Sequence, residues 1–485
     1  MLFNSWIFWV FLPCVLGGYF LLPRRGQNAW LLAASYVFYG WWDWRFLGLI
    51  LLSTSIDYFA GLGLDWRCDE GADSPRRLGP GRRRTLLLLS LGANLGVLGF
   101  FKYFHFFEEN LIQLLSALVG RPVSPSGLNV ILPIGVSFYT FQTMSYTIDV
   151  YRGKLRSTRD PLEFATFVAF FPQLVAGPIV RASDLLPQIA ANRRFDFAQV
   201  SSGAYLILWG MFKKAVVADN LAPVVDGVFA RDPSLLFGAD TLWAVYAFAF
   251  QIYCDFSGYT DIARGCAKLM GFEFDLNFNL PYSARNPSEF WARWHISLSS
   301  WLRDYLYIPL GGNRCAPGRV YFNLMATMLL GGLWHGASWT FVVWGLYQGL
   351  LLIAYRFAGA RLEAVPALAR LGRWRAVRFL RWLAFFHLVC LGWLIFRAET
   401  FGQMYRMLRS LAEGMQFAAA GDLAWRTLFF ASPVIAMQIV QHWTGRLEWP
   451  LRLPAPARGA VYAALLAGIV LFGRFQGNEF IYFQF

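Results

Sequence analysis

The chain has 485 residues, of which 57% are hydrophobic, 18% aromatic and only 15% charged. Charged residues make up about 25% of a typical soluble domain, so this composition excludes a string of soluble globular domains and indicates a polytopic membrane protein. The net charge of +14 does not indicate nucleic-acid binding, because most arginines lie in short segments between apolar runs. That distribution is typical of a membrane-topology signal.

The apolar runs start at the N-terminus and recur throughout the chain. About 20 apolar residues cross the hydrocarbon core of a bilayer. The first run, "MLFNSWIFWVFLPCVLGGYFLL", has no basic region before it and no small-residue cleavage site after it, so we expect a retained span. We predict an all-α polytopic protein with ten to thirteen spans, forming one domain over residues 1–485 with a core at roughly 130–356. The expected spans lie near 3–22, 29–42, 45–64, 84–101, 130–150, 162–180, 200–220, 235–255, 320–335, 336–356, 377–397, 425–443 and 459–474.

Two arginine-rich segments predict the orientation of the chain. Residues 66–84 hold six arginines and residues 356–381 hold seven, so the positive-inside rule places both in the cytoplasm. Arg314 and Arg319 share that side if the next two runs form a hairpin. His335 then lies 16 residues, or about 24 Å along a helix, from Arg319. We therefore expect His335 in the outer half of the membrane, where a titratable side chain indicates a functional site.

Residues 286–314 are too polar for an ordinary span. Their three tryptophans, Trp291, Trp294 and Trp301, have spacings that place them on one face of a helix. We expect one or two helices at 288–308 that lie in the cytoplasmic interface or re-enter from it. His295 would then face the core that holds His335.

Known catalytic and metal-binding motifs do not settle the chemistry. The five histidines and six cysteines show no metal-ligand or CxxC spacing, and neither a P-loop nor a GxSxG elbow stands in a convincing context, so no metal site is predicted. From its position alone, His335 could be a general base in acyl transfer, a proton relay in a transporter or a structural core residue. Asp255, in "QIYCDFSGYTDIARG", is more typical of a structural residue that caps a helix or pairs with an arginine.

Two blocks identify a family. "SEFWARWHISLSSWLRDYLYIPLGGNR" followed by "MLLGGLWHGASWTFVVWGLYQG" closely resembles the membrane-bound O-acyltransferases, in particular the bacterial branch that acetylates alginate and other exopolysaccharides. "QIYCDFSGYTDIARG", the opening "MLFNSWIFWVFLP" and the ending "EFIYFQF" are similar to that branch as well. The resemblance implies about 11–13 membrane helices, with interfacial or re-entrant helices, around a central tunnel. It also implies that His335 is the active-site histidine and His295 its second position.

The resemblance further implies the reaction and its participants. His335 would be the general base toward a hydroxyl that attacks acetyl-CoA, and His295 would position the thioester or stabilise developing charge. No permanently bound cofactor is expected, and acetyl-CoA is the donor. The acetyl group would pass across the bacterial inner membrane to a periplasmic SGNH-type partner with a serine nucleophile, which modifies alginate or a similar exopolysaccharide; whether His335 itself carries the acetyl group stays open.

Further candidates flank the two histidines. Arg293, Arg314 and Arg319 could hold the phosphates of coenzyme A. Asp255, Asp304 and Trp334 are additional candidates for the site. The glycines Gly331, Gly332 and Gly336 are interpreted as leaving room for a tunnel beside the His335 ring.

Three alternative functions follow from the same residues. A D-alanyl transferase of the teichoic-acid branch would take its acyl group from a carrier protein. A proton-coupled polysaccharide or lipid transporter would use His335, His295 and Asp255 as a relay, although intramembrane acids are scarce. A non-catalytic scaffold of a secretion complex would not need the two histidine blocks.

Overall fold

The computed structural model is helical and places the chain in two compact units. Within the residues it describes there is no β-strand, which confirms the predicted all-α class. The single-domain organisation stays a prediction. One unit comprises residues 1–203 and 266–275, and the other 204–265 and 276–485. The structure describes residues 1–65, 78–174, 177–363, 370, 374–418, 420–475, 480 and 481, so Arg67, Arg76, Arg77, Arg373 and residues 482–485 lie outside it.

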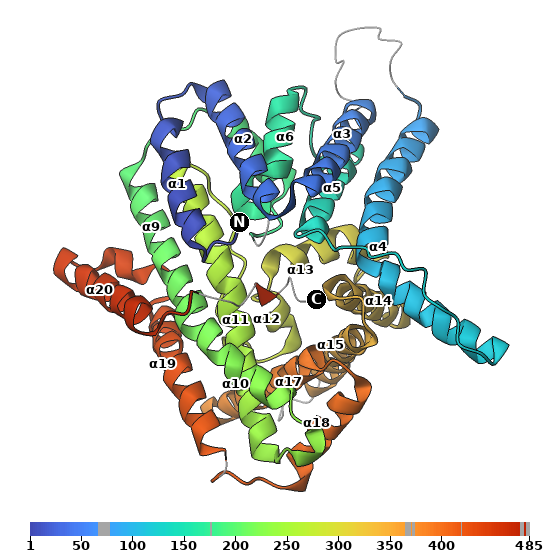
Figure 1. The fold of residues 1–485 in the computed structure, drawn as a ribbon, viewed down its shortest axis with the longest axis vertical. Coiled ribbons are helices and arrows are strands. Elements are labelled where there is room, and N and C mark those ends of the chain that lie inside the picture. Colours follow the sequence, from blue (N-terminus) through green and yellow to red (C-terminus); the bar gives the residue numbers. More distant parts are fainter. Residues whose placement is uncertain are drawn as a thin grey trace. The chain divides into compact units, whose positions relative to one another are not determined.

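The first unit is built from the helices coloured blue to teal in Figure 1. Its core holds a cluster of phenylalanine rings from α1, α2 and α7, with Phe8, Phe38 and Phe171 fully buried. The helices are α1 (Trp6–Tyr19), α2 (Arg24–Asp43), η1 (Trp44–Phe46), α3 (Leu47–Leu64), α4 (Pro80–Val119), α5 (Val136–Tyr151), α6 (Pro161–Ala169), α7 (Phe171–Leu174) and α8 (Ala182–Ala190).

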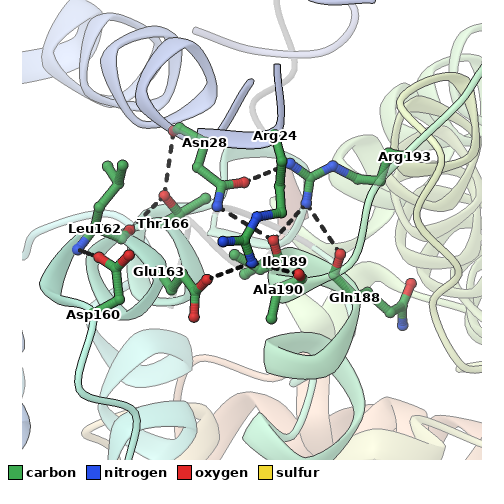
Figure 2. Close-up of polar contacts among 10 residues, drawn as sticks. All are labelled: Arg24, Asn28, Asp160, Leu162, Glu163, Thr166, Gln188, Ile189, Ala190 and Arg193. Atoms are coloured by element: carbon green, nitrogen blue, oxygen red, sulfur yellow. Dashed lines mark hydrogen bonds and ion pairs between the residues drawn. The ribbon is translucent and has the colours of Figure 1, made fainter. Parts of the chain in front are cut away.

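A polar network fastens three of these helices to one another (Figure 2). Arg193 donates to the carbonyl oxygen of Ile189 at 2.8 Å and to the side-chain oxygen of Asn28. Arg24, at the start of α2, pairs with Glu163 of α6 at 3.1 Å. These hydrogen bonds and the ion pair connect the start of α2, the helix α6 and the end of α8.

The second unit contains both histidine blocks. Its helices are α9 (Phe197–Met211), the π-helix η2 (Phe212–Ala218), α10 (Asp219–Phe229), η3 (Pro233–Leu235), α11 (Gly238–Leu269), η4 (Pro281–Ser283), α12 (Pro287–Trp291), α13 (Ile296–Leu302), the π-helix η5 (Arg303–Tyr307), α14 (Pro317–His335), α15 (Trp339–Glu363), α17 (Arg375–Arg397), α18 (Phe401–Glu413), α19 (Gly421–Thr444), η6 (Trp449–Arg452) and α20 (Ala455–Phe472). The helices α9 and α11 contribute residues to both units.

Six helical stretches of the described chain are long and apolar enough to cross a membrane: Arg24–Leu64, Pro80–Val119, Trp339–Gly359, Arg375–Arg397, Gly421–Thr444 and Ala455–Phe472. The first of these includes both α2 and α3. The long helix α11 falls outside this set and carries buried acidic residues, including Asp255. The multi-pass membrane architecture is confirmed, whereas the expected number of about 11–13 spans stays a prediction.

Two expected elements differ from the observed ones. The expected span 162–180 is not one helix, because α6 ends at Ala169 and only the four-residue α7 follows before Gly177. The expected helix or helices at 288–308 are two short α-helices, α12 and α13, separated at residues 292–295 and followed by η5. The spacing predicts that Trp291, Trp294 and Trp301 share one helical face. Because these residues belong to different segments, that prediction is wrong.

Candidate active site

His335 is the last residue of α14. The helix begins at Pro317, so Arg319 lies in its first turn and His335 in its last, as the depth argument requires. Gly336 has an extended backbone, and α15 starts at Trp339 and runs back along α14. The side chain of His335 is 4% exposed. The hairpin thus places the imidazole at the end of a long helix, inside the protein.

Glycines in this hairpin serve close helix packing. A Cβ at Gly332 would lie 2.3 Å from the carbonyl oxygen of Phe341, and one at Gly345 would lie 2.5 Å from that of Met328. A Cβ at Gly336 would lie 2.1 Å from the Phe341 ring. The interpretation of Gly332 and Gly336 as room for a tunnel is therefore wrong: the space beside them is filled by α15.

Aromatic side chains surround the His335 ring. The centroids of the Trp344, Trp334 and Phe396 rings lie 5.1, 5.2 and 5.5 Å from it, all nearly perpendicular to the imidazole. Edge-to-face contacts of this kind fix ring orientation and exclude water. An imidazole in its neutral form can accept a proton from a hydroxyl.

His295 has a left-handed backbone at the start of α13. Its φ is +43°, an unusual value for a residue with a side chain, and it is 1% exposed. The conformation is held from both sides, because the backbone N–H of Ile296 donates to the carbonyl of Asn277 and that of Asn279 donates to Arg293, each at 2.9 Å. Strain of about 1–3 kcal/mol in such a residue is a known mark of functional sites.

Asn277 sets the protonation pattern of His295. The backbone N–H of Ser297 donates to the Asn277 side-chain oxygen at 3.1 Å, so this atom is an acceptor. The His295 Nδ1 lies 3.3 Å from the same oxygen and 3.4 Å from the Ser297 hydroxyl, which itself donates to the Asn277 oxygen at 2.9 Å; in the tautomer that fits these contacts, Nδ1 donates to Asn277. Nδ1 therefore carries the hydrogen and Nε2 carries the lone pair. Burial lowers the pKa of His295 to about 3, which keeps the ring neutral near pH 7.

Trp334 connects the two histidines. Its indole centroid lies 6.0 Å from the His295 ring and 5.2 Å from the His335 ring. Both predicted site histidines therefore contact the same indole in a buried aromatic cluster, although they are 40 residues apart in the sequence. A buried site with two imidazoles suits proton transfer during attack by a hydroxyl on an acyl donor.

Comparison with known proteins decides the family. The model of the membrane-bound O-acyltransferase family matches residues 147–396, which include both histidines. The chain belongs to this family.

The protein is thus an O-acyltransferase, and its relatives narrow the type. It is 39% identical to the probable alginate O-acetylase AlgI of Azotobacter vinelandii over 100% of both chains. It is 34% identical to the peptidoglycan O-acetyltransferase of Helicobacter pylori, over 91% of this chain and 88% of the other. Similarity to the teichoic acid D-alanyltransferase of Bacillus subtilis is lower, 28% over 56% of this chain and 70% of the other. The full-length similarity is to O-acetylating members of the family.

The remaining predicted residues of the O-acyltransferase are not all near the two histidines, since Arg319 lies at the opposite end of α14 from His335. Arg293 donates to the Asn279 carbonyl at 3.2 Å, and Asp304 pairs with Arg303 at 2.7 Å. Arg314 and Arg319 have exposed side chains at the start of α14, with Arg319 over the ring of Phe322. A role of the three arginines in binding coenzyme A stays a prediction.

Asp255 has the structural role that the sequence favours, but its ion-pair partner is a lysine and not an arginine. Its carboxylate lies 2.6 Å from Nζ of Lys214, which also pairs with Asp219 at 2.8 Å. The second carboxylate oxygen accepts the backbone N–H of Ile481 at 2.7 Å and so fastens the C-terminal segment. The neighbouring Phe256 packs edge-on against the His295 ring at 4.7 Å.

Sequence reasoning missed Asn277, Trp344 and Phe396. Asn277 stands in "LNFNLPY", where no periodicity or motif singles it out. The two aromatic residues are common types in a chain with 18% aromatic content. The buried pair Lys213–Lys214, in contrast, had a usable signal, because two adjacent lysines inside an apolar run must find carboxylates.

Proposed function

We propose that this O-acyltransferase takes acetyl from cytoplasmic acetyl-CoA and passes it across the bacterial inner membrane for the O-acetylation of an exopolysaccharide, alginate or a similar polymer. The final acceptor is modified by a periplasmic SGNH-type partner with a serine nucleophile. The observation that carries the proposal is the pair of buried imidazoles on the Trp334 indole, in a chain similar over its full length to an alginate O-acetylase.

In the proposed chemistry, His335 is the general base. The acceptor hydroxyl attacks the carbonyl carbon of the acetyl thioester while its proton moves to the His335 imidazole. The tetrahedral intermediate then collapses, the C–S bond breaks, and the proton passes from the imidazolium to the departing sulfur. The products are an acetyl ester and free coenzyme A. General base catalysis contributes about 10²–10⁴-fold to such a step.

His295 has a different role in this proposal. Because its Nδ1–H is used by Asn277, its Nε2 can accept a hydrogen bond but cannot donate one to a developing oxyanion. We therefore assign His295 to holding a hydroxyl or water through Nε2, rather than to stabilising negative charge. The left-handed backbone and the Asn277 oxygen fix the direction of that lone pair.

The decisive experiment follows label and thiol with acetyl-labelled acetyl-CoA, using the purified protein in nanodiscs with and without an added SGNH-type partner. We expect wild type to release free thiol and transfer label, and His335→Ala to lose about 10²–10⁴-fold in rate. His442→Ala is the matched control, because His442 is exposed on α19. Equal rates for wild type and His335→Ala, or no consumption of acetyl-CoA by wild type, would refute the proposal.

A further inference from the structure

A cavity lies in the unit that holds the histidines. Its volume is about 760 Å³, and it is formed where residues 285–289, α15 and α17 meet. This volume is within the range of about 300–1,000 Å³ found for small-molecule sites. The cavity has an apolar wall and a basic end.

The apolar wall is made of small and aliphatic side chains. Leu351, Ala354 and Ala358 come from α15, and Ala384 and Leu388 come from α17. Several wall residues are exposed to the surroundings of the helices, with Tyr355 43% and Leu388 39% exposed. Because α15 and α17 contribute membrane-crossing stretches, these exposed positions face lipid. The cavity is therefore open to acyl chains.

Among the described lining residues, the basic end carries more positive than negative side chains. Arg285, Arg378 and Arg381 line it together with Glu289. Glu289 accepts the backbone N–H of Arg285 at 3.0 Å and lies 3.9 Å from its guanidinium. Among the described residues, no hydrogen bond or ion pair engages the guanidinium groups of Arg378 and Arg381. Two arginines one helical turn apart thus line the cavity, and no described carboxylate pairs with either of them.

The basic end coincides with the ends of two membrane helices. Arg378 and Arg381 lie in the first two turns of α17, which begins at Arg375. The wall residues of α15 lie in its last four turns, before it ends at Glu363. Antiparallel packing of α15 against α17 brings these ends to the same side of the bilayer, so the arginines lie where phosphate headgroups lie.

We propose that this cavity binds an anionic glycerophospholipid. Its phosphate would be held by Arg378 and Arg381, since guanidinium groups bind phosphate through paired hydrogen bonds. One acyl chain would follow the wall formed by Leu351, Ala354 and Leu388. Coenzyme A shares the phosphate chemistry, but an apolar wall open to lipid suits an acyl chain. The proposal does not depend on the acetyl transfer proposed above.

The test measures lipid binding by native mass spectrometry of the purified chain with phosphatidylglycerol or phosphatidylcholine. We expect preferential retention of phosphatidylglycerol by wild type, and at least a tenfold loss of that affinity in Arg378→Gln/Arg381→Gln. Arg375→Gln is the matched control, because this arginine starts the same helix and does not line the cavity. It should bind phosphatidylglycerol like wild type.

A second variant separates the cavity from the charge. Ala358→Trp keeps all arginines and fills the space beside the apolar wall, so it should lose phosphatidylglycerol binding as the double variant does. If the double variant does not fold, Ala358→Trp alone tests whether the cavity binds the lipid. Equal binding by wild type and both variants would overturn the proposal, as would equal loss in Arg375→Gln. Displacement of bound lipid by free coenzyme A would overturn it as well, by assigning the basic end to the nucleotide.

Discussion

Asn277 is the residue that decides which nitrogen of His295 can act in the site. The Asn277 side-chain oxygen accepts two hydrogen bonds from Ser297, one from the backbone N–H at 3.1 Å and one from the hydroxyl at 2.9 Å. The Nδ1 of His295, 3.3 Å from the same oxygen, is the third donor. Side chains that orient a functional histidine are known in metal sites, where their loss costs about 10–100-fold in activity or affinity. We assign the same positioning role to Asn277.

Substituting Asn277 should reduce turnover with acetyl-CoA while leaving the protein folded. We expect Asn277→Ala to lose about 10–100-fold in kcat, because the His295 ring is then free to change tautomer and orientation. Asn277→Asp restores an acceptor and adds a negative charge beside the ring. Retention of full kcat by Asn277→Ala would show that Asn277 does not position His295.

The Asn277→Asp variant should also change the pH dependence of kcat. Burial lowers the pKa of His295 to about 3 in the wild type, so His295 should cause no loss of activity from pH 8 down to pH 5. In Asn277→Asp the carboxylate favours the imidazolium and raises this pKa, so activity should fall on the acid side of the profile at a higher pH than in wild type. Profiles of kcat between pH 5 and 8 test this. A superimposable profile would exclude His295 as the group that must stay neutral.

The packing of α14 against α15 is the element-scale feature that places His335. Because a Cβ at Gly332 would lie 2.3 Å from the Phe341 carbonyl, Gly332→Ala must push the two helices apart. Overpacking typically costs about 1–3 kcal/mol. We expect a lower midpoint of thermal unfolding in detergent and a lower turnover, because His335 moves with the end of α14.

Gly318, in the first turn of the same helix, provides the control. A Cβ there would meet no atom within 4 Å, so Gly318→Ala should be neutral or stabilise the helix by up to about 1 kcal/mol. If Gly332→Ala unfolds at the same temperature as Gly318→Ala, close approach of the helices is not required.

The buried ion pair between η2 and α11 is a second element-scale feature. Lys214 and Asp255 have side chains only 1% and 4% exposed, and Asp255 also holds the N–H of Ile481. Removing one member of a buried pair costs about 3–5 kcal/mol, because it leaves a buried charge. Asp255→Asn keeps an acceptor for Ile481 and removes the charge alone.

We expect Asp255→Asn to lower the midpoint of thermal unfolding in detergent, by less than the full cost of a broken pair because Lys214 keeps Asp219 at 2.8 Å. The control is Asp226→Asn, which removes a carboxylate that is 56% exposed and 3.0 Å from Arg397. An exposed pair contributes only about 0–1 kcal/mol, so this variant should unfold near wild type. Equal midpoints for the two variants would contradict a stabilising role for the buried pair.

At the scale of the whole molecule, composition and apolar runs predicted the membrane class and most helices, because a span needs a long apolar stretch. His335 and His295 could be found because polar residues in apolar surroundings are rare and their blocks resemble a family. Asn277 could not, since one loop amide has no periodic signature and its role depends on a contact with residue 295. The tight spacing behind Gly332 was equally hidden, because it depends on which helix packs against α14.

Orientation is the whole-molecule property that the arginine distribution predicts. Because Arg375 is the first residue of α17, Glu399 follows two residues after its end, and 23 helical residues span about 34 Å, the two residues should lie on opposite sides of the membrane. In a background without the six native cysteines, Arg375→Cys should react with a membrane-impermeant maleimide only from the cytoplasm, and Glu399→Cys only from outside. Glu399 suits the labelling because its side chain is 75% exposed. Arg314→Cys should behave like Arg375→Cys, because the hairpin of α14 and α15 returns to the side from which it started. Labelling of Arg314→Cys from outside would show that the hairpin has the opposite orientation. His335 would then lie near the cytoplasm and not in the outer half of the membrane.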